Sequence, residues 1–147
     1  MRQNWFAAAV IYKEAENGCV TFLLQKSEAI HPRYPAKIKF PGGMRGRNDK
    51  TSQRTVAREV REETGLKLKK GGYPQVVFSV VDHDRTKKFF LFNALAFDGE
   101  LRKEELLDGD SRLFPPYWAD LNEAQISLCS SHQPGLIEAL KYLGLMR

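Results

Sequence analysis

Three glutamates stand where a helix would bring them onto one face. Glu59, Glu62 and Glu63 occupy positions i, i+3 and i+4, the spacing of neighbours on a helix surface. Like charges at this spacing repel one another, and a hard divalent cation with oxygen ligands relieves the repulsion. By itself such a cluster is most often a solvated acidic face, and a carboxylate site for a hard divalent cation is the functional alternative.

A pair of glycines upstream can complete such a site. Gly42 and Gly43 follow Pro41, and glycine lets the backbone approach a ligand closely. A backbone carbonyl at Gly43 could then join the glutamates as a metal ligand. Arg58 lies i, i+4 from Glu62, where it could hold a carboxylate in position.

Basic residues on both sides of the glycines are candidate contacts to a phosphorylated substrate. Arg33 and Lys39 precede the glycines and Arg45 follows them. Arginine and lysine both bind phosphate groups, arginine through a planar fork of donors. An exposed side chain without a ligand is the alternative for each of them.

A helix is needed to present the three carboxylates. Residues 51–64 contain neither glycine nor proline, so a helix is expected there. Asp49 or Thr51 could cap its N-terminus, and Gly65 stands where a glycine would end it. The helix should therefore begin a few residues after the glycine pair.

The remaining pattern predicts one α+β domain over residues 1–147. Asn17-Gly18 is a hairpin-type turn signal, and residues 27–36 and 98–110 are expected to be loops. Strands are expected at 5–12, 20–25, 38–40, 76–81 and 88–97 and from Tyr117, and a last helix at 134–143.

Composition limits the class of protein. The 147 residues are 42% hydrophobic and 28% charged, as in a globular domain rather than a disordered chain. No apolar run reaches membrane length, and the two cysteines are expected to be reduced thiols in a cytoplasmic protein. The net charge of +5 favours anionic partners such as phosphates, nucleic acid or anionic membranes without separating them.

The segment from Arg58 to Leu66 (REVREETGL) resembles the second half of the signature of the Nudix hydrolases, including the MutT-like members. Pro41-Gly42-Gly43 resembles the loop that opens that signature. The order of strands and helices around the motif is also similar to the family's. The resemblance implies the Nudix fold, in which a mixed β-sheet is sandwiched between α-helices.

The sequence departs from the signature at one point. The spacing from Gly43 to Arg58 is one residue longer than in the family. Counting forward from Gly43 places Asp49 at the position of an outer glutamate, whereas counting back from Arg58 places Lys50 there. This insertion puts the loop geometry in question and leaves the three glutamates unaffected.

The resemblance implies hydrolysis of a diphosphate linkage in a nucleoside di- or triphosphate or another nucleoside diphosphate derivative. Gly43 and the glutamates at 59, 62 and 63 would hold Mg²⁺ or Mn²⁺, which orients the diphosphate and activates a water. In some members a helix glutamate accepts the water's proton, and in others a glutamate on a later loop does. In this sequence Glu104 is the candidate on that loop. His132 precedes the last helix, where some relatives contact the nucleobase, and an exposed loop histidine is the alternative.

If Glu104 is that base, Glu104→Gln should lower turnover by about a hundredfold or more. Unchanged turnover would exclude Glu104 as the base. The alternative interpretation of Glu104 is an exposed acid on a loop.

Two other functions remain open from the sequence. Basic residues favour an RNA 5′-end pyrophosphohydrolase or decapping-type enzyme, whose RNA binding should weaken steeply with salt. A non-catalytic nucleotide-binding module would bind without turnover. Nucleic acid is thus a possible partner, but a nucleotide-like small molecule is the preferred one. A membrane partner is not expected. The chain is expected to be a monomer or a homodimer.

Overall fold

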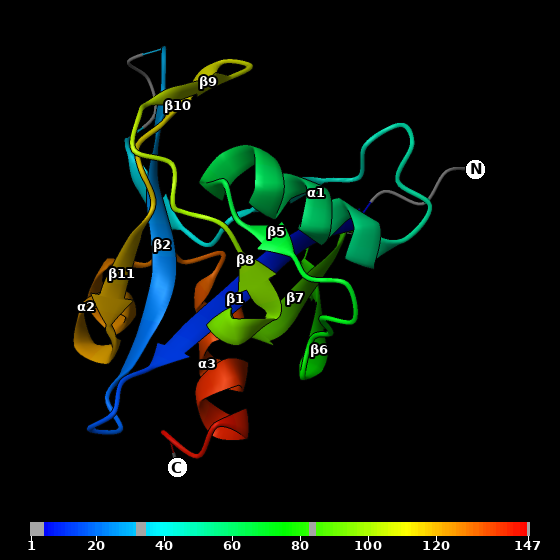
Figure 1. Ribbon diagram of the computed structural model, residues 1–147. Helices are drawn as coiled ribbons and strands as arrows, with labels where there is room; N and C mark the ends of the chain where they lie inside the picture. The colour runs from blue at the N-terminus through cyan, green and yellow to red at the C-terminus, as the bar shows by residue number, and fades with distance from the viewer. Residues whose placement is uncertain (1–4, 32–34, 83–84, 147) are drawn as a thin grey trace.

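The computed structural model describes residues 5–31, 35–82 and 85–146. A mixed sheet runs through the molecule, with helices on both of its faces (Figure 1). Its strands are β1 (Trp5–Glu14), β2 (Val20–Ala29), β3 (Lys37–Lys39), β4 (Gly42–Met44), β6 (Val76–Asp82), β7 (Arg85–Asn93), β9 (Leu106–Asp108), β10 (Ser111–Leu113) and β11 (Tyr117–Asp120). The helices are α1 (Ser52–Thr64), α2 (Leu121–Ser127), α3 (Gln133–Tyr142) and a 3₁₀ turn, η1 (Ala94–Ala96). A separate two-stranded sheet pairs β5 (Lys67–Leu68) with β8 (Phe97–Asp98).

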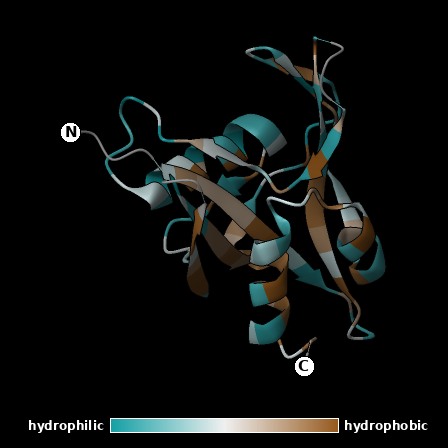
Figure 2. Cartoon of the chain, turned by 180° about the vertical axis from the view of Figure 1, so that it is seen from behind, coloured by the Kyte–Doolittle hydropathy of each residue, from teal (hydrophilic) through white to brown (hydrophobic). Residues whose placement is uncertain are grey.

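Strand β1 is the centre of the sheet. It pairs in parallel with β7 and antiparallel with β2 and β4, in the main order β6-β7-β1-β2-β10-β9. Successive strand residues point to opposite faces, so Ala7, Ala9 and Ile11 join one hydrophobic cluster while Ala8 and Val10 join the other. Apolar residues accordingly concentrate in the central strands, as Figure 2 shows. The predicted sheet sandwiched between helices is confirmed.

Helix α1 covers one face of the sheet because its apolar residues share one side. Val56 and Val60, at i and i+4, are fully buried in the cluster that contains Ala9. Thr51 caps the helix by accepting from the Arg54 backbone N–H at 3.2 Å. Gly65 ends it with a φ of 86°, a left-handed conformation that favours glycine. Helices α2 and α3 pack on the opposite face.

Several expected element boundaries were wrong. Strand β2 runs to Ala29, into the expected loop, because β3 and β10 both pair with its C-terminal half. The expected strand at 88–97 ends at Asn93, whose side chain accepts from the Leu95 N–H and starts a 3₁₀ turn. The expected loop at 98–110 contains β9, and α2 was not predicted.

Within the described residues, no helix is long and apolar enough to cross a bilayer.

Candidate active site

The Glu59 carboxylate lies directly against Gly43. A Cβ built on Gly43 would stand 2.6 Å from Glu59 Oε1 and 2.7 Å from its carboxyl carbon. No side chain therefore fits at residue 43 while Glu59 keeps this position. Strand β4 holds the glycine in place because Gly43 pairs with Ala7 of the central strand. The sheet and the helix thus bring a backbone peptide and a carboxylate together.

Glu63 is the most enclosed carboxylate of the signature. Its side chain is 3% exposed, and Oε1 accepts from the Gly42 backbone N–H at 2.7 Å. The Lys39 ammonium lies 3.4 Å from Oε2 and 3.5 Å from the Gly42 carbonyl oxygen. Burial raises the pKa of Glu63, while Lys39 and the Gly42 N–H oppose that rise. The helix and the glycine strand are therefore linked through Glu63.

Arg58 connects the helix carboxylates to the inserted loop. Its guanidinium lies 3.1 Å from a carboxylate oxygen of Glu59 and 3.1 Å from one of Glu62, and 2.9 Å from Asp49 Oδ2. It also donates to the Met44 carbonyl at 3.3 Å. These contacts are consistent with the predicted role of Arg58 in positioning a carboxylate. The Glu59 side chain is 12% exposed and the Glu62 side chain is 51% exposed, so Glu59 is the more constrained of the two.

Asp49 occupies the outer acidic position, and Lys50 is exposed. Besides Arg58, Asp49 Oδ2 accepts from the Gly46 backbone N–H at 2.7 Å and the Thr55 hydroxyl at 3.0 Å. The hydrogen bond from Arg58 is the main reason that the pKa of Asp49 falls to about 2, although burial opposes it. An aspartate is one methylene shorter than a glutamate, and the loop is one residue longer, so it can bring the shorter carboxylate to Arg58.

We expect Asp49→Asn to destabilise the fold by about 2–3 kcal/mol, because hydrogen bonds to a charged group are lost in a buried place. Turnover should fall about tenfold or more, since Arg58 loses the partner that orients it beside Glu59. Chemical denaturation and steady-state kinetics measure the two effects. Lys50→Ala, one residue away and exposed, is the matched control. Equal effects of the two variants would contradict the assignment of Asp49.

The Glu59 carboxyl is poised between its two protonation states. Burial is the main cause that raises its pKa to about 7; the charge of Glu63 adds to the rise and Arg58 opposes it. The positive charge of a bound cation would stabilise the ionised form of Glu59 despite its burial. It would also offset the repulsion between Glu59 and Glu63. This electrostatic arrangement favours cation binding.

This shift predicts a pH-dependent effect of metal on stability. The folded pKa of Glu59 lies above its unfolded value of 4.5, so the folded state holds its proton more tightly. Its contribution to stability is full below about pH 4.5 and is lost as pH rises through about 7. Mg²⁺ should therefore raise the melting temperature more at pH 8 than at pH 5. Thermal unfolding in EDTA and in Mg²⁺ measures this, and equal increments at both pH values would contradict it.

The residues fit a small oxygen-ligated cation that keeps part of its hydration. Across the described ranges, no three His, Cys, Asp or Glu side chains converge closely enough to hold a metal ion. Glu59 and Glu63 can supply two carboxylates, and Gly43 presents its peptide without a side chain in the way. Mg²⁺ commonly binds through one or two carboxylates, waters and substrate phosphates. Glu62 stands outside this pair and faces Arg58.

The four candidate substrate contacts have different environments. Lys39 is engaged by Glu63, and Arg45 lies over the Trp5 ring at 4.3 Å while its Nε donates to the Asp49 carbonyl at 3.0 Å. Both flank the glycine strand and remain candidate phosphate contacts. Arg33 lies outside the described residues.

His132 is buried rather than exposed. Only 5% of the residue is accessible, and its Nδ1 accepts from the Phe40 backbone N–H at 3.1 Å. The rings of Phe6, Phe40 and Phe89 surround it at centroid distances of 5.5–5.9 Å. Burial lowers the pKa of His132 to about 3, so the imidazole is neutral at pH 7. A contact to substrate stays a prediction, and the observed contacts anchor the strand that enters Pro41.

The Glu104 side chain is exposed, on a segment that Arg102 attaches to the helix. Arg102 Nε donates to the Glu63 carbonyl at 2.8 Å, and its guanidinium also donates to the carbonyls of Glu104 and Phe114. Sequence reasoning missed Arg102, because its partners are main-chain carbonyls, which no pattern of side-chain types records. It also missed Gln25, a fully buried amide; the available signal was a polar residue at an inward position of an apolar strand.

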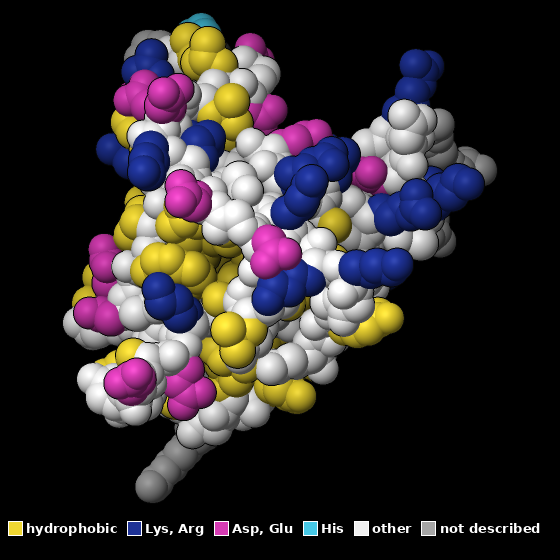
Figure 3. Space-filling model, in the orientation of Figure 1, with side chains coloured by type: hydrophobic (Ala, Val, Ile, Leu, Met, Phe, Trp, Pro, Cys, Tyr) yellow, Lys and Arg dark blue, Asp and Glu magenta, His cyan; other side chains and the backbone are white. Residues whose placement is uncertain are grey.

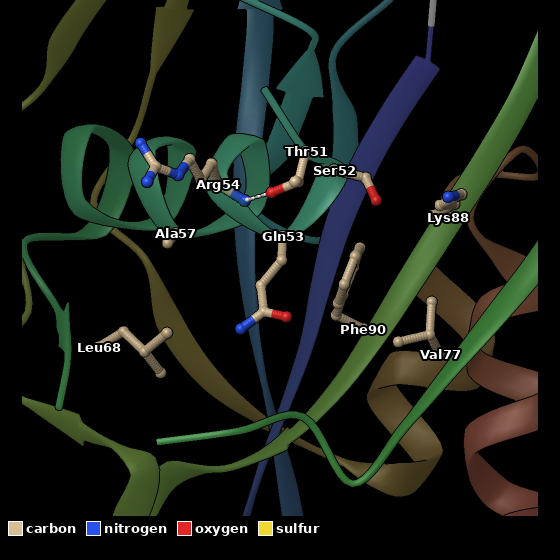
Figure 4. A pocket seen from close by; sticks show the side chains of 9 residues that line it. All are labelled: Thr51, Ser52, Gln53, Arg54, Ala57, Leu68, Val77, Lys88 and Phe90. Carbon is tan, nitrogen blue, oxygen red and sulfur yellow. Dashed lines mark hydrogen bonds between the residues drawn. The ribbon is translucent and has the colours of Figure 1, made fainter. Parts of the chain in front are cut away.

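A hollow lies beside α1, away from the three signature glutamates. Its volume is about 570 Å³, and Figure 4 shows the Gln53 side chain reaching into it between α1 and β7. Lys88 and Phe90 form its β7 wall. None of the signature glutamates lines it, so this hollow is separate from the carboxylate site.

Comparisons with known proteins agree with the geometry. The NUDIX domain model matches residues 4–141. No curated protein matches the chain significantly in sequence.

Many solved structures share its fold, among them the following three. A MutT NUDIX hydrolase from Burkholderia pseudomallei is 23% identical, with a TM-score of 0.63 over 93% of this chain and 98% of that one. A C. elegans Ap4A hydrolase in a binary complex is 17% identical, with a TM-score of 0.61 over 95% and 96% of the two chains. The NUDIX domain of Shewanella oneidensis NrtR, complexed with ADP ribose, is 16% identical, with a TM-score of 0.63 over 97% and 90%.

These identities support a shared fold, and the family assignment rests on the domain match across most of the chain. The structural counterpart of that match is the group formed by Glu59 and Glu63 of α1, the glycine strand against them and Arg58 beside them. The chain belongs to the NUDIX hydrolase family.

Proposed function

We propose that this NUDIX hydrolase uses Mg²⁺ or Mn²⁺ to cleave a diphosphate linkage in a nucleoside di- or triphosphate or another nucleoside diphosphate derivative. The observation that carries the proposal is the enclosed pair Glu59 and Glu63 beside Gly43, where repulsion and burial disfavour two free carboxylates. The structural relatives named as an Ap4A hydrolase and as bound to ADP ribose support a nucleotide substrate.

Each residue of the site has a role in this proposal. Glu59, Glu63 and the Gly43 carbonyl would hold the cation, with Glu62 as a further ligand or water contact. The bound cation would neutralise the diphosphate and lower the pKa of a water. Arg58 keeps Glu59 and Glu62 oriented, and most of the rate gain would come from such positioning and charge stabilisation.

The group that accepts the water's proton is the open part of the mechanism. Glu62 and Glu104 are the candidates, and both carboxylates are exposed. The charge of Asp108 on β9 is the smallest contribution to the raised pKa of Glu59. Glu104→Gln and Asp108→Asn, assayed side by side, test whether this segment supplies the base.

The first experiment is phosphate release from a panel of nucleotides, dinucleotides, nucleotide sugars and 5′-triphosphate RNA, with Mg²⁺, Mn²⁺ or EDTA. The native chain is compared with Glu63→Gln and with Glu138→Gln, a helix carboxylate whose side chain is 44% exposed, as control. Turnover that requires metal, persists in Glu138→Gln and disappears in Glu63→Gln supports the proposal. Nucleotide binding without turnover of any substrate would favour the non-catalytic module.

An RNA substrate is the second candidate. Figure 3 shows lysine and arginine side chains gathered over α1 and the loop that precedes it. Preferential turnover of 5′-triphosphate RNA, with binding that weakens steeply as salt rises, would favour that function.

A further inference from the structure

Gln25 carries a side-chain amide where an apolar side chain would be expected. The residue is fully buried on β2, and neither its Nε2 nor its Oε1 has a hydrogen-bond partner among the described residues. Leu23, two residues earlier on the same face of the strand, packs in the cluster beneath α1. An unsatisfied buried amide is unfavourable and calls for an explanation.

The amide lies beside the Glu63 carboxylate. Gln25 and Lys39 are direct partners between β2 and β3, so their side chains share one face of the sheet. The Gln25 amide favours the ionised form of Glu63 without forming a hydrogen bond of normal geometry. Two donors therefore contact this carboxylate, the Gly42 N–H and the Lys39 ammonium, and the Gln25 amide stands next to Lys39 without a partner of its own.

These donors differ in how they respond to a bound cation. A divalent cation at Glu59 and Glu63 would repel the Lys39 ammonium, which lies 3.4 Å from Glu63 and 3.5 Å from the Gly42 carbonyl. The Gln25 amide is uncharged and is not repelled. If the ammonium withdraws, Glu63 loses one donor and a neighbouring amide without a partner can replace it.

We propose that Gln25 is a positioning residue for Glu63, whose amide N–H becomes the donor to that carboxylate when a divalent cation is bound and Lys39 withdraws. This inference rests on the metal dependence in the proposed function. It gives a physical role to a polar side chain that is otherwise buried without a partner. It also leaves Lys39 free to meet substrate phosphate in the metal-bound state.

The test compares Gln25→Met, an unbranched apolar replacement of similar length, with the native chain. Calorimetric titration with Mn²⁺ in the absence of nucleotide should show about tenfold to a hundredfold weaker binding. In EDTA the variant should melt about 3 °C higher than the native chain, because the unsatisfied amide is gone. Gln75→Met, an exposed amide that donates to Tyr12 at 2.7 Å, is the control and should keep the native affinity. Unchanged Mn²⁺ affinity in Gln25→Met would overturn the proposal.

A second measurement uses the native chain first, so its main result does not depend on the folding of a variant. The side-chain amide signals of Gln25 in an amide-detected NMR spectrum should move downfield when Mg²⁺ is added, as the amide donates to a carboxylate. In Lys39→Met the same displacement should be present before Mg²⁺ is added. Amide signals that stay at the same position when Mg²⁺ binds would contradict the new hydrogen bond. If the native chain binds neither Mn²⁺ nor Mg²⁺, the metal dependence itself is wrong and this inference falls with it.

Discussion

Glu59→Gln is expected to lower metal-dependent turnover by at least about a hundredfold, because it removes a charged ligand from the proposed cation site. The metal-free variant should nevertheless melt at a higher temperature than the native chain at pH 8. Burial and the neighbouring Glu63 charge disfavour the ionised Glu59, and a neutral amide avoids both effects. Steady-state kinetics and thermal unfolding in EDTA measure the two changes.

The same variant should reduce the difference between the metal effects at pH 5 and pH 8, since the group that titrates near 7 is absent. Glu138→Gln, the same acid-to-amide change at a partly exposed position on α3, is the matched control and should leave turnover and stability unchanged. Retained turnover in Glu59→Gln would exclude Glu59 as an essential ligand. A lower melting temperature in EDTA would show that the carboxylate stabilises the metal-free fold.

Alanine at the two adjacent glycines is expected to have different consequences. A Cβ on Gly43 meets the flexible end of the Glu59 side chain, which can move aside. Gly43→Ala should therefore fold with less than about 1 kcal/mol lost, while turnover falls about a hundredfold or more because the carboxylate is displaced from the glycine peptide. A Cβ on Gly42 meets the main chain of β1, including Ala8 Cα at 2.6 Å. Gly42→Ala should destabilise the fold by about 3 kcal/mol or more.

Denaturant unfolding and Mn²⁺ titration of both variants separate the two roles. Gly43→Ala should unfold near the native midpoint and bind Mn²⁺ weakly, whereas Gly42→Ala should unfold at a lower denaturant concentration. The adjacent variant serves as the control for each. Similar stability losses in both would show that residue 43 is constrained by the sheet rather than by Glu59.

Local signals predicted α1 and its ends well. The absence of glycine and proline, a threonine cap and a left-handed Gly65 are properties of neighbouring residues, and the structure has all three at the expected positions. The hairpin turn at Gly18, with a φ of 84°, was also predicted from adjacent residues. Such features depend on contacts a few residues apart, which a sequence pattern records directly.

Pairing between distant segments was predicted poorly. β9 and β10 are three residues each and have no strong apolar alternation. They form strands because β10 pairs with the extended end of β2. A short strand of this kind is stabilised by its partner rather than by its own residues, so the expected loop was wrong.

The sequence determined the presence of a carboxylate-bearing helix, the glycine pair and the arginine beside them, because residue type and helical spacing decide which groups can share a face. Only the tertiary structure decided that Asp49 rather than Lys50 reaches Arg58, that Glu63 and Glu59 are enclosed while Glu62 is half exposed, and that Gln25 lies beside Glu63. Those distinctions depend on how β2, β4 and α1 pack together, because packing sets the burial of each carboxyl and the charges and donors beside it, and all of these shift its pKa.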